Sequence, residues 1–193
     1  MISMRRSRAD ARWAVLFGGL SLAFIAVAAA SPAFFNWAFQ RHHNVLSWYV
    51  RPLFLIPFCF FAYRRSWAGI FGTLFALLTS MFWFPVPAAV SDSVRAFLAM
   101  EMAYLTGAWA VPKVLLSLLV PICLSVLGMA FWRRNLWFGL TVVVLIAVAK
   151  LTWSVAFGGE AGWSILAPAA VGLVVCAVFI YLGFRRMERS RQP

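Results

Sequence analysis

Arg51 is the residue of this chain whose position most clearly requires a partner. It lies 13 residues before Arg64 in a run that is otherwise apolar, which is about 20 Å along a helix. If Arg64 marks one edge of a hydrocarbon layer about 30 Å thick, Arg51 lies about 10 Å below the other edge. A guanidinium at that depth costs at least about 2.5–3.5 kcal/mol. We therefore expect Arg51 to face protein and to meet an opposite charge.

Glu101 is the predicted partner of Arg51. It stands in an apolar stretch, whereas Asp92 and Glu160 lie in polar or glycine-rich turns. Three interpretations stay open. The pair locks a surface helix onto a helical bundle, or both residues belong to an outward-facing polar pocket, or Arg51 reaches the lipid headgroups by snorkelling.

Two lysines extend the pocket interpretation. Lys150 lies 16 residues after Arg134, about 24 Å along a helix. Lys113 lies 20 residues before Arg133, about 30 Å along a helix. Both ammonium groups therefore come near the same outer boundary, where a basic pocket would attract an anionic or zwitterionic molecule.

Two tryptophans accompany the buried cations. Trp48 and Trp153 lie within one helical turn of Arg51 and Lys150, where they either form a cation–π wall or anchor the helices at the interface. No catalytic residue and no metal ligand is predicted. The candidate ligand-binding residues are Arg51, Glu101, Lys150, Lys113, Trp48 and Trp153.

The histidines and cysteines give weaker indications. His42 and His43 end the aromatic segment 32–44, which we interpret as lying at the membrane interface with both histidines solvated. The three cysteines lie inside apolar runs with no C-x-x-C spacing, so buried thiols are expected rather than a disulfide or a metal site. No cofactor is expected.

The composition excludes a water-soluble globule. Hydrophobic residues make up 64% of the 193 residues and charged residues 11%, against about 45–50% and about 25% in soluble domains. Stretches of about 20 nearly uncharged residues, the length that crosses a bilayer, recur along the chain at 13–31, 45–63, 67–84, 111–132, 136–157 and 163–184. The predicted fold is an all-α integral membrane protein, a single membrane domain over 1–193 with six transmembrane helices.

The basic residues predict the orientation. Most of the 17 lysines and arginines precede the first span, follow the last, or form the pairs Arg64-Arg65 and Arg133-Arg134 in short turns. Six crossings place all of these on one side, so both termini should be cytoplasmic. The net charge of +12 then reflects topology and attraction to anionic lipids at the cytoplasmic face, not nucleic-acid binding. The expected location is the inner membrane of a prokaryote, with several crossings.

Three segments are expected to depart from simple crossings. Residues 13–31 also resemble a secretory signal with a cleavage-like site, but we interpret them as a retained helix of the bundle. The second span should be broken near Arg51-Pro52, with 44–51 irregular or separately helical and 52–63 continuing inward. An amphipathic surface helix is expected over 92–106, between Ser91 and Gly107.

These features favour a transporter, channel or solute-binding membrane module with an outward-facing basic pocket. Its ligand would be an anionic or zwitterionic small molecule or a lipid headgroup. One alternative is a structural or regulatory subunit of a larger membrane complex, with partner subunits or as a homo-oligomer. A second is a lipid-modifying enzyme using Glu101 and His42 or His43 as acid and base. We do not expect an enzyme, because the sequence has no G-x-S-x-G, H-E-x-x-H or P-loop motif.

Overall fold

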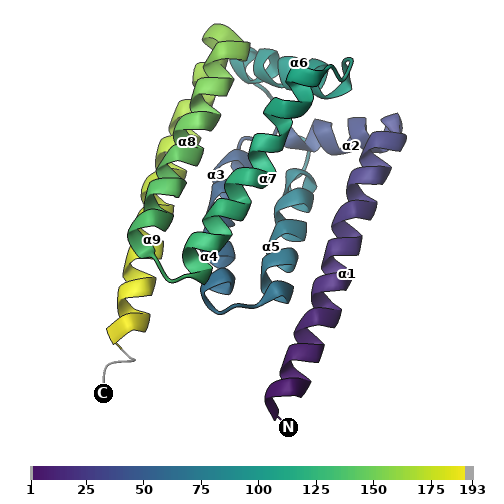
Figure 1. Ribbon diagram of the computed structural model, residues 1–193. Coiled ribbons are helices and arrows are strands. Elements are labelled where there is room, and N and C mark those ends of the chain that lie inside the picture. The colour runs from purple at the N-terminus through teal and green to yellow at the C-terminus, as the bar shows by residue number, and fades with distance from the viewer. Residues whose placement is uncertain (1, 190–193) are drawn as a thin grey trace. The chain divides into compact units, whose positions relative to one another are not determined.

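The computed structural model of the chain describes residues 2–189, and side chains from residue 7 onward. Every regular element in this part is helical (Figure 1), in agreement with the predicted all-α class. The chain separates into two compact units, Met1–Pro87 and Ala88–Pro193. They are called the N-terminal and the C-terminal unit, and each is described by itself.

Among residues 2–189, four helical segments are long and apolar enough to cross a membrane: Ser7–Ala30, Leu46–Tyr63, Val111–Trp132 and Leu136–Arg189. The last contains two helices that pack against each other. Trp67–Phe82 is a shorter apolar helix. The span expected over 67–84 ends early because Pro85 and Pro87 follow closely, and proline cannot continue a helical hydrogen-bond ladder.

The N-terminal unit is built around the pairing of its first and fifth helices. Helix α1 packs along α5, α5 also packs against α4, and α2 and α3 both contact η1 (Figure 1). The elements are α1 (Ile2–Ala30), α2 (Pro32–His42), α3 (Leu46–Leu53), α4 (Leu55–Tyr63), α5 (Trp67–Thr79) and the 3₁₀ helix η1 (Ser80–Phe82).

Most of the aromatic segment 32–44, predicted to lie at the membrane interface, forms helix α2. The Ser31 hydroxyl accepts the Phe34 N–H at 3.3 Å, and Pro32 occupies the first turn. A capping serine followed by proline is a helix start. Ser31 and Pro32 are therefore a local indication of a helix start that the sequence prediction does not include.

The break in the second apolar segment lies at Phe54, three residues beyond the expected position. Arg51 is helical, in the last turn of α3. Pro52 and Pro57 flank the break, and each lacks the N–H that would continue the ladder. The Phe54 N–H instead bonds the Arg51 carbonyl at 3.2 Å, a three-residue contact. The residues before the break, predicted to be either irregular or separately helical, therefore form a separate helix, α3.

A carboxylate from α1 caps α5. Asp10 accepts the Ser66 hydroxyl at 2.6 Å, the Trp67 N–H at 2.9 Å and the Ala68 N–H at 3.4 Å. Ser66 in turn accepts the Gly69 N–H at 3.1 Å. A negative charge at a helix N-terminus satisfies N–H groups that have no partner within the helix. Asp10 therefore fixes the register between α1 and α5.

We expect Asp10→Ala to lower the stability of the N-terminal unit by about 1–3 kcal/mol, because a charge-assisted acceptor is removed from three donors. The measurement is the midpoint of thermal unfolding of the purified protein in detergent. Asp92→Ala is the matched control, since Asp92 is an exposed acid in the first turn of another helix. Equal midpoints for the two variants would contradict the capping role.

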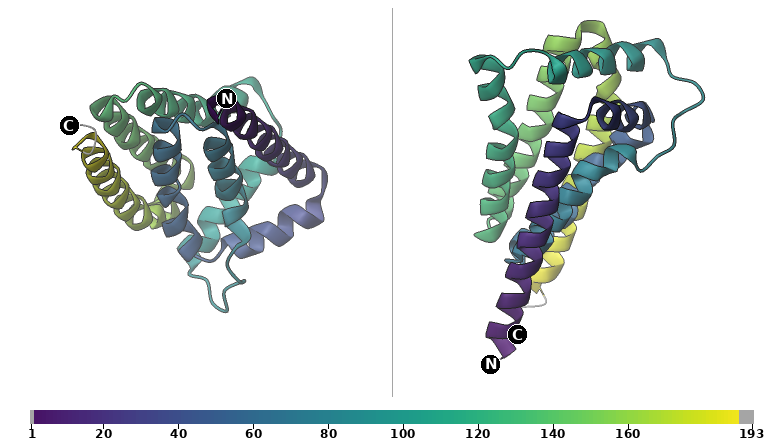
Figure 2. Two further views of the ribbon diagram at one scale, coloured as in Figure 1. Left: turned by 90° about the horizontal axis from the view of Figure 1, so that it is seen from below. Right: turned by 90° about the vertical axis from the view of Figure 1, so that its right-hand side faces the viewer.

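The C-terminal unit centres on α8, which packs against α7 on one side and α9 on the other. Helix α6 contacts α8 and η2, and Figures 1 and 2 show it running across the ends of α7 and α8 rather than alongside them. The elements are α6 (Asp92–Thr106), α7 (Val111–Trp132), α8 (Leu136–Gly158), the 3₁₀ helix η2 (Gly159–Ile165) and α9 (Leu166–Arg189).

Helix α6 begins and ends where the sequence predicts. The Ser91 hydroxyl accepts the Val94 N–H at 3.4 Å, and the chain leaves the helix at Gly107. The buried face consists of Val94, Phe97 and Leu98. Glu101 lies four residues after Phe97 and three after Leu98, so its side chain is on the same side of α6 as this buried face.

Two turns share one geometry. Arg65 and Arg134 have φ values of 54° and 60°, the left-handed region in which a side chain is strained and glycine is favoured. In the first turn the Ser66 N–H reaches back to Phe61, and in the second the Asn135 N–H reaches back to Ala130. Each turn therefore ends one helix and caps the next, and each exposes two consecutive arginines.

Candidate functional site

In the C-terminal unit, Glu101 on α6 forms an ion pair with Lys150 on α8. The Nζ and Oε1 atoms are 2.8 Å apart. The Glu101 side chain is 16% exposed and that of Lys150 is 44% exposed. The carboxylate is thus held in a largely buried position by a cation that still meets the surroundings. The predicted pairing of Glu101 with Arg51 involves the other unit and stays a prediction.

Aromatic rings surround the ion pair. The Lys150 Nζ atom lies 4.5 Å from the centre of the Trp153 ring and 5.6 Å from that of Phe97. Trp153 packs edge-on against Tyr104, with ring centres 5.4 Å apart. Helices α6 and α8 each supply their side chains at spacings of three and four residues, which places these side chains on one face of each helix. We name this the lysine–aromatic cluster; its members are Phe97, Glu101, Tyr104, Trp109, Lys113, Lys150, Trp153 and Phe157.

Lys113 joins the cluster through Tyr104. Its Nζ atom donates to the Gly107 carbonyl at 2.8 Å, and it lies 4.9 Å from the Tyr104 ring centre and 4.4 Å from that of Trp109. The Tyr104 hydroxyl lies 3.2 Å from the Ser117 hydroxyl on α7. Tyr104 therefore contacts Lys113 on one side and Trp153 on the other, so the two lysines belong to one continuous surface.

The C-terminal unit thus brings together four of the six predicted site residues: Glu101, Lys113, Lys150 and Trp153. The prediction did not include Phe97, Tyr104, Trp109 or Phe157, whose ring centre lies 6.1 Å from that of Tyr104 and 5.6 Å from that of Trp153. Tyr104 could have been found, because it follows Glu101 by three residues and so shares its face of the helix. Trp109 lies in the connection between α6 and α7, and only the course of that connection places it beside Lys113.

The cluster presents ammonium donors and aromatic faces on one surface. An ammonium group that is half exposed keeps donors for a carboxylate or phosphate, and the aromatic faces favour cations. With two lysines and one glutamate, the cluster carries a net charge of about +1 at neutral pH. In the described part of the chain no group of three histidine, cysteine or acidic residues is placed to hold a metal ion.

In the N-terminal unit, Arg51 and Trp48 join a buried hydrogen-bond network around His42. The Arg51 Nη1 atom lies 3.3 Å from His42 Nε2. His42 Nδ1 lies 3.1 Å from the Ser47 hydroxyl, and the Trp48 indole N–H donates to the His42 carbonyl at 3.1 Å. His42 is 6% exposed, so the expectation that it is solvated was wrong. It is buried because it closes the corner between α2 and α3.

The partners of His42 determine its protonation. A guanidinium group can only donate, so Nε2 must accept and the proton lies on Nδ1. The Ser47 hydroxyl independently requires the same tautomer, because it donates its own hydrogen to the Asn44 carbonyl at 2.8 Å and must accept from Nδ1. His42 is therefore neutral in this arrangement. It donates to Ser47 instead of taking its proton, which is the reverse of what a serine nucleophile needs.

His43 has a different role from its neighbour. Its Nδ1 atom lies 2.9 Å from the Phe39 carbonyl, which only accepts, so this nitrogen carries the proton. His43 is partly buried and bonds within its own helix. It provides a natural comparison for the effect of removing His42.

Comparison with known protein families, curated proteins and solved structures found no match to this chain. A function must therefore be inferred from the lysine–aromatic cluster and the His42 network themselves.

Proposed function

We propose that the chain is a multi-pass membrane protein with six crossings and both termini in the cytoplasm of a prokaryotic cell. The four long apolar segments support this, because Leu136–Arg189 contains two helices that pack side by side. Trp67–Phe82 would be the remaining crossing, with local thinning of the bilayer. The arginine pairs in both short turns fit the cytoplasmic side. Arg191, one of the basic residues counted for this side, lies outside the described residues.

We further propose that the protein is a transporter, channel or solute-binding module, whose ligand contacts the lysine–aromatic cluster. The observation that carries the proposal is the half-exposed Lys150 held 2.8 Å from a largely buried Glu101. A charged pair among apolar helices is costly and commonly marks a ligand or ion pathway. Two lysines beside aromatic rings fit an anionic or zwitterionic small molecule or a lipid headgroup.

The ion pair suggests how such a ligand would be held. An incoming carboxylate or phosphate would take the exposed side of the Lys150 ammonium group, as a charge-assisted hydrogen bond. A zwitterion would also offer a cation to Glu101, so both protein charges would keep a partner. Lys113 would supply a second positive charge on the same surface. The protein would therefore exchange an internal ion pair for one with the ligand.

We expect Lys150→Gln to abolish ligand binding while the fold remains extractable in detergent. The measurement is the shift in thermal unfolding midpoint with a panel of amino acids, short dicarboxylates and inorganic phosphate, followed by uptake of any active solute into proteoliposomes. Arg95→Gln is the matched control, since it removes one positive charge from an exposed position on α6 outside the cluster.

The opposite outcome would identify a structural role. If no solute shifts the midpoint, and the apolar double variant Glu101→Leu with Lys150→Met unfolds at or above the wild-type midpoint, the pair is only a lock between α6 and α8. Apolar replacement of such a lock is often neutral or stabilising. The protein would then be better described as a structural or regulatory subunit of a larger membrane complex.

A further inference from the structure

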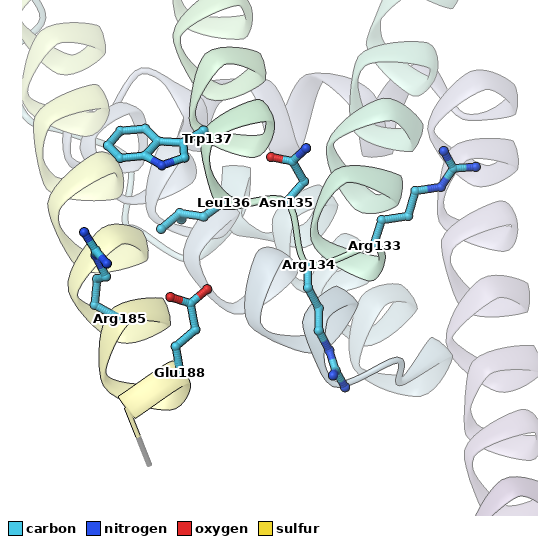
Figure 3. Close-up of a pocket in the computed structure, with 7 residues that line it drawn as sticks. All are labelled: Arg133, Arg134, Asn135, Leu136, Trp137, Arg185 and Glu188. Atoms are coloured by element: carbon cyan, nitrogen blue, oxygen red, sulfur yellow. The ribbon is translucent and has the colours of Figure 1, made fainter. Parts of the chain in front are cut away.

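A basic groove lies at the other end of the C-terminal unit, between the α7–α8 turn and the last turns of α9. Its volume is about 400 Å³ and it is lined by Arg133, Arg134, Asn135, Leu136, Trp137, Arg185 and Glu188 (Figure 3). A second groove of about 460 Å³ adjoins it and is lined by Tyr181, Leu182, Arg185, Arg186 and Arg189. Arg185 is common to both. We name the two together the arginine groove.

The groove has a strong positive charge. Five arginines and one acid, Glu188, line it. Figure 3 shows Glu188 projecting from α9 toward the turn that carries Arg134, with Arg185 on the same helix, while Arg133 points away. All of these charged side chains are exposed. A bound anion in the groove would be attracted by arginines from both the α7–α8 turn and α9 and repelled by Glu188.

An apolar border adjoins the charges. Trp137 is 67% exposed and Leu182 is 58% exposed, and the Trp137 ring centre lies 6.1 Å from that of Tyr181. Arg185 lies over the Tyr181 ring at 5.4 Å, and its Nε atom donates to the Tyr181 hydroxyl at 3.3 Å. One end of Arg185 is thus positioned by an aromatic residue at the edge of an apolar surface. Arginine beside tryptophan and tyrosine is typical of the headgroup region.

We propose that the arginine groove binds the phosphate headgroup of an anionic phospholipid, with the acyl chains against the apolar side of Trp137 and Leu182. Phosphate suits arginine because the guanidinium donates two parallel hydrogen bonds. A lipid suits the groove better than a free anion, because the charges are open to solvent on one side and border exposed apolar side chains on the other. This binding is separate from the lysine–aromatic cluster; it rests on the proposed membrane insertion and not on the proposed transport role.

The α4–α5 turn provides an internal control. It has the same left-handed arginine and the same number of exposed arginines. There, however, the Trp67 and Ala68 N–H groups at the start of the next helix bind the carboxylate of Asp10, whereas at the start of α8 the side chain of Asn135 accepts the Phe138 N–H. The two turns therefore match in charge and backbone geometry but differ in that a carboxylate already lies at the α4–α5 turn.

The test uses the full-length protein purified in a neutral detergent. Phosphatidylglycerol, phosphatidylcholine or inorganic phosphate is added, and lipid retention is measured by native mass spectrometry alongside the unfolding midpoint. Phosphatidylglycerol is expected to be retained and to raise the midpoint, unlike phosphatidylcholine. The double variant Arg134→Gln with Arg185→Gln should weaken its retention at least tenfold. Arg64→Gln with Arg65→Gln should change retention less than twofold.

Glu188→Gln gives a prediction of the opposite sign. Removing the carboxylate should increase phosphatidylglycerol retention at least twofold, because the lipid no longer competes with an internal anion. Circular dichroism of each variant checks that helix content is unchanged, and Arg185→Gln alone replaces the double variant if that fails to fold. Equal retention of the two lipids, or equal losses in both double variants, would overturn the proposal. An equal midpoint shift with inorganic phosphate at matched concentration would also overturn it and identify a free-phosphate site.

Discussion

Replacing His42 with phenylalanine is expected to lower the stability of the N-terminal unit by about 2–3 kcal/mol. The ring shape is kept, but the acceptor for Arg51 Nη1 and the donor to the Ser47 hydroxyl are both lost. Ser47 is fully buried, so its hydroxyl has no access to water in compensation. Bonds to a charged group in a low-dielectric setting contribute more than neutral ones. The measurement is the midpoint of thermal unfolding in detergent.

His43→Phe is the matched control for this variant, because the neighbouring ring bonds only to the Phe39 carbonyl of its own helix. Its expected loss is below about 1 kcal/mol, the usual net value of a neutral hydrogen bond. His42→Gln should lie between the two, since an amide oxygen can still accept from Arg51. Nitrogen NMR of labelled protein provides an independent check: His42 should show a protonated Nδ1 and an unprotonated Nε2. A protonated Nε2 would refute the network as described.

Gly139→Ala is expected to destabilise the C-terminal unit by about 1–3 kcal/mol, the usual range for overpacking a well-packed core. A methyl group at Gly139 would overlap the end of the Phe131 ring. Phe131 is fully buried and packs against Phe184 on α9 with ring centres 4.7 Å apart. The ring therefore cannot move away without disturbing the contact of α7 and α8 with α9.

Gly183→Ala is the control for this second variant. It lies in α9 next to Phe184, and a methyl group there would meet nothing within 4 Å. We expect it to leave stability unchanged or to raise it by up to about 1 kcal/mol, because alanine favours helix more than glycine does. Combining Gly139→Ala with Phe131→Leu should recover part of the loss. Equal effects of the two glycine substitutions would contradict the close packing at Gly139.

The long apolar helices could be predicted because their cause is local. An apolar run of about 20 residues must satisfy its backbone groups internally, and only a helix does so within one segment. The run at 111–132 matches α7, and the cap at Ser91 with the stop at Gly107 matches α6. The prediction differs from the structure where capping or proline chemistry competes with hydropathy. The helix start at Ser31-Pro32, and with it α2, was not predicted. The break in the second apolar segment was predicted near Arg51 and lies at Phe54.

The sequence indicates which charged side chains need a partner, but not which side chains surround each of them. The cost of burying charge singles out Arg51, Glu101 and Lys150 from the sequence, whatever their partners are. The crossing of α6 over α8 places Glu101 2.8 Å from Lys150, residues separated by 49 positions. Nothing in the sequence indicates that His42 is buried and bonded to Arg51. That contact depends on the corner between α2 and α3, which brings Arg51 to the His42 Nε2 atom.

By itself, then, the amino-acid sequence determined which segments are apolar helices and which charged residues cannot lie among them without a partner. Both follow from free energies of transfer, which depend on residue type and position along one helix. Tertiary structure alone decided that Lys150 meets Glu101, that Arg51 meets a neutral His42, and that Arg134 and Arg185 line one groove. Hydrogen bonds and ion pairs act over a few ångströms, so they depend on how helices cross and turn rather than on composition.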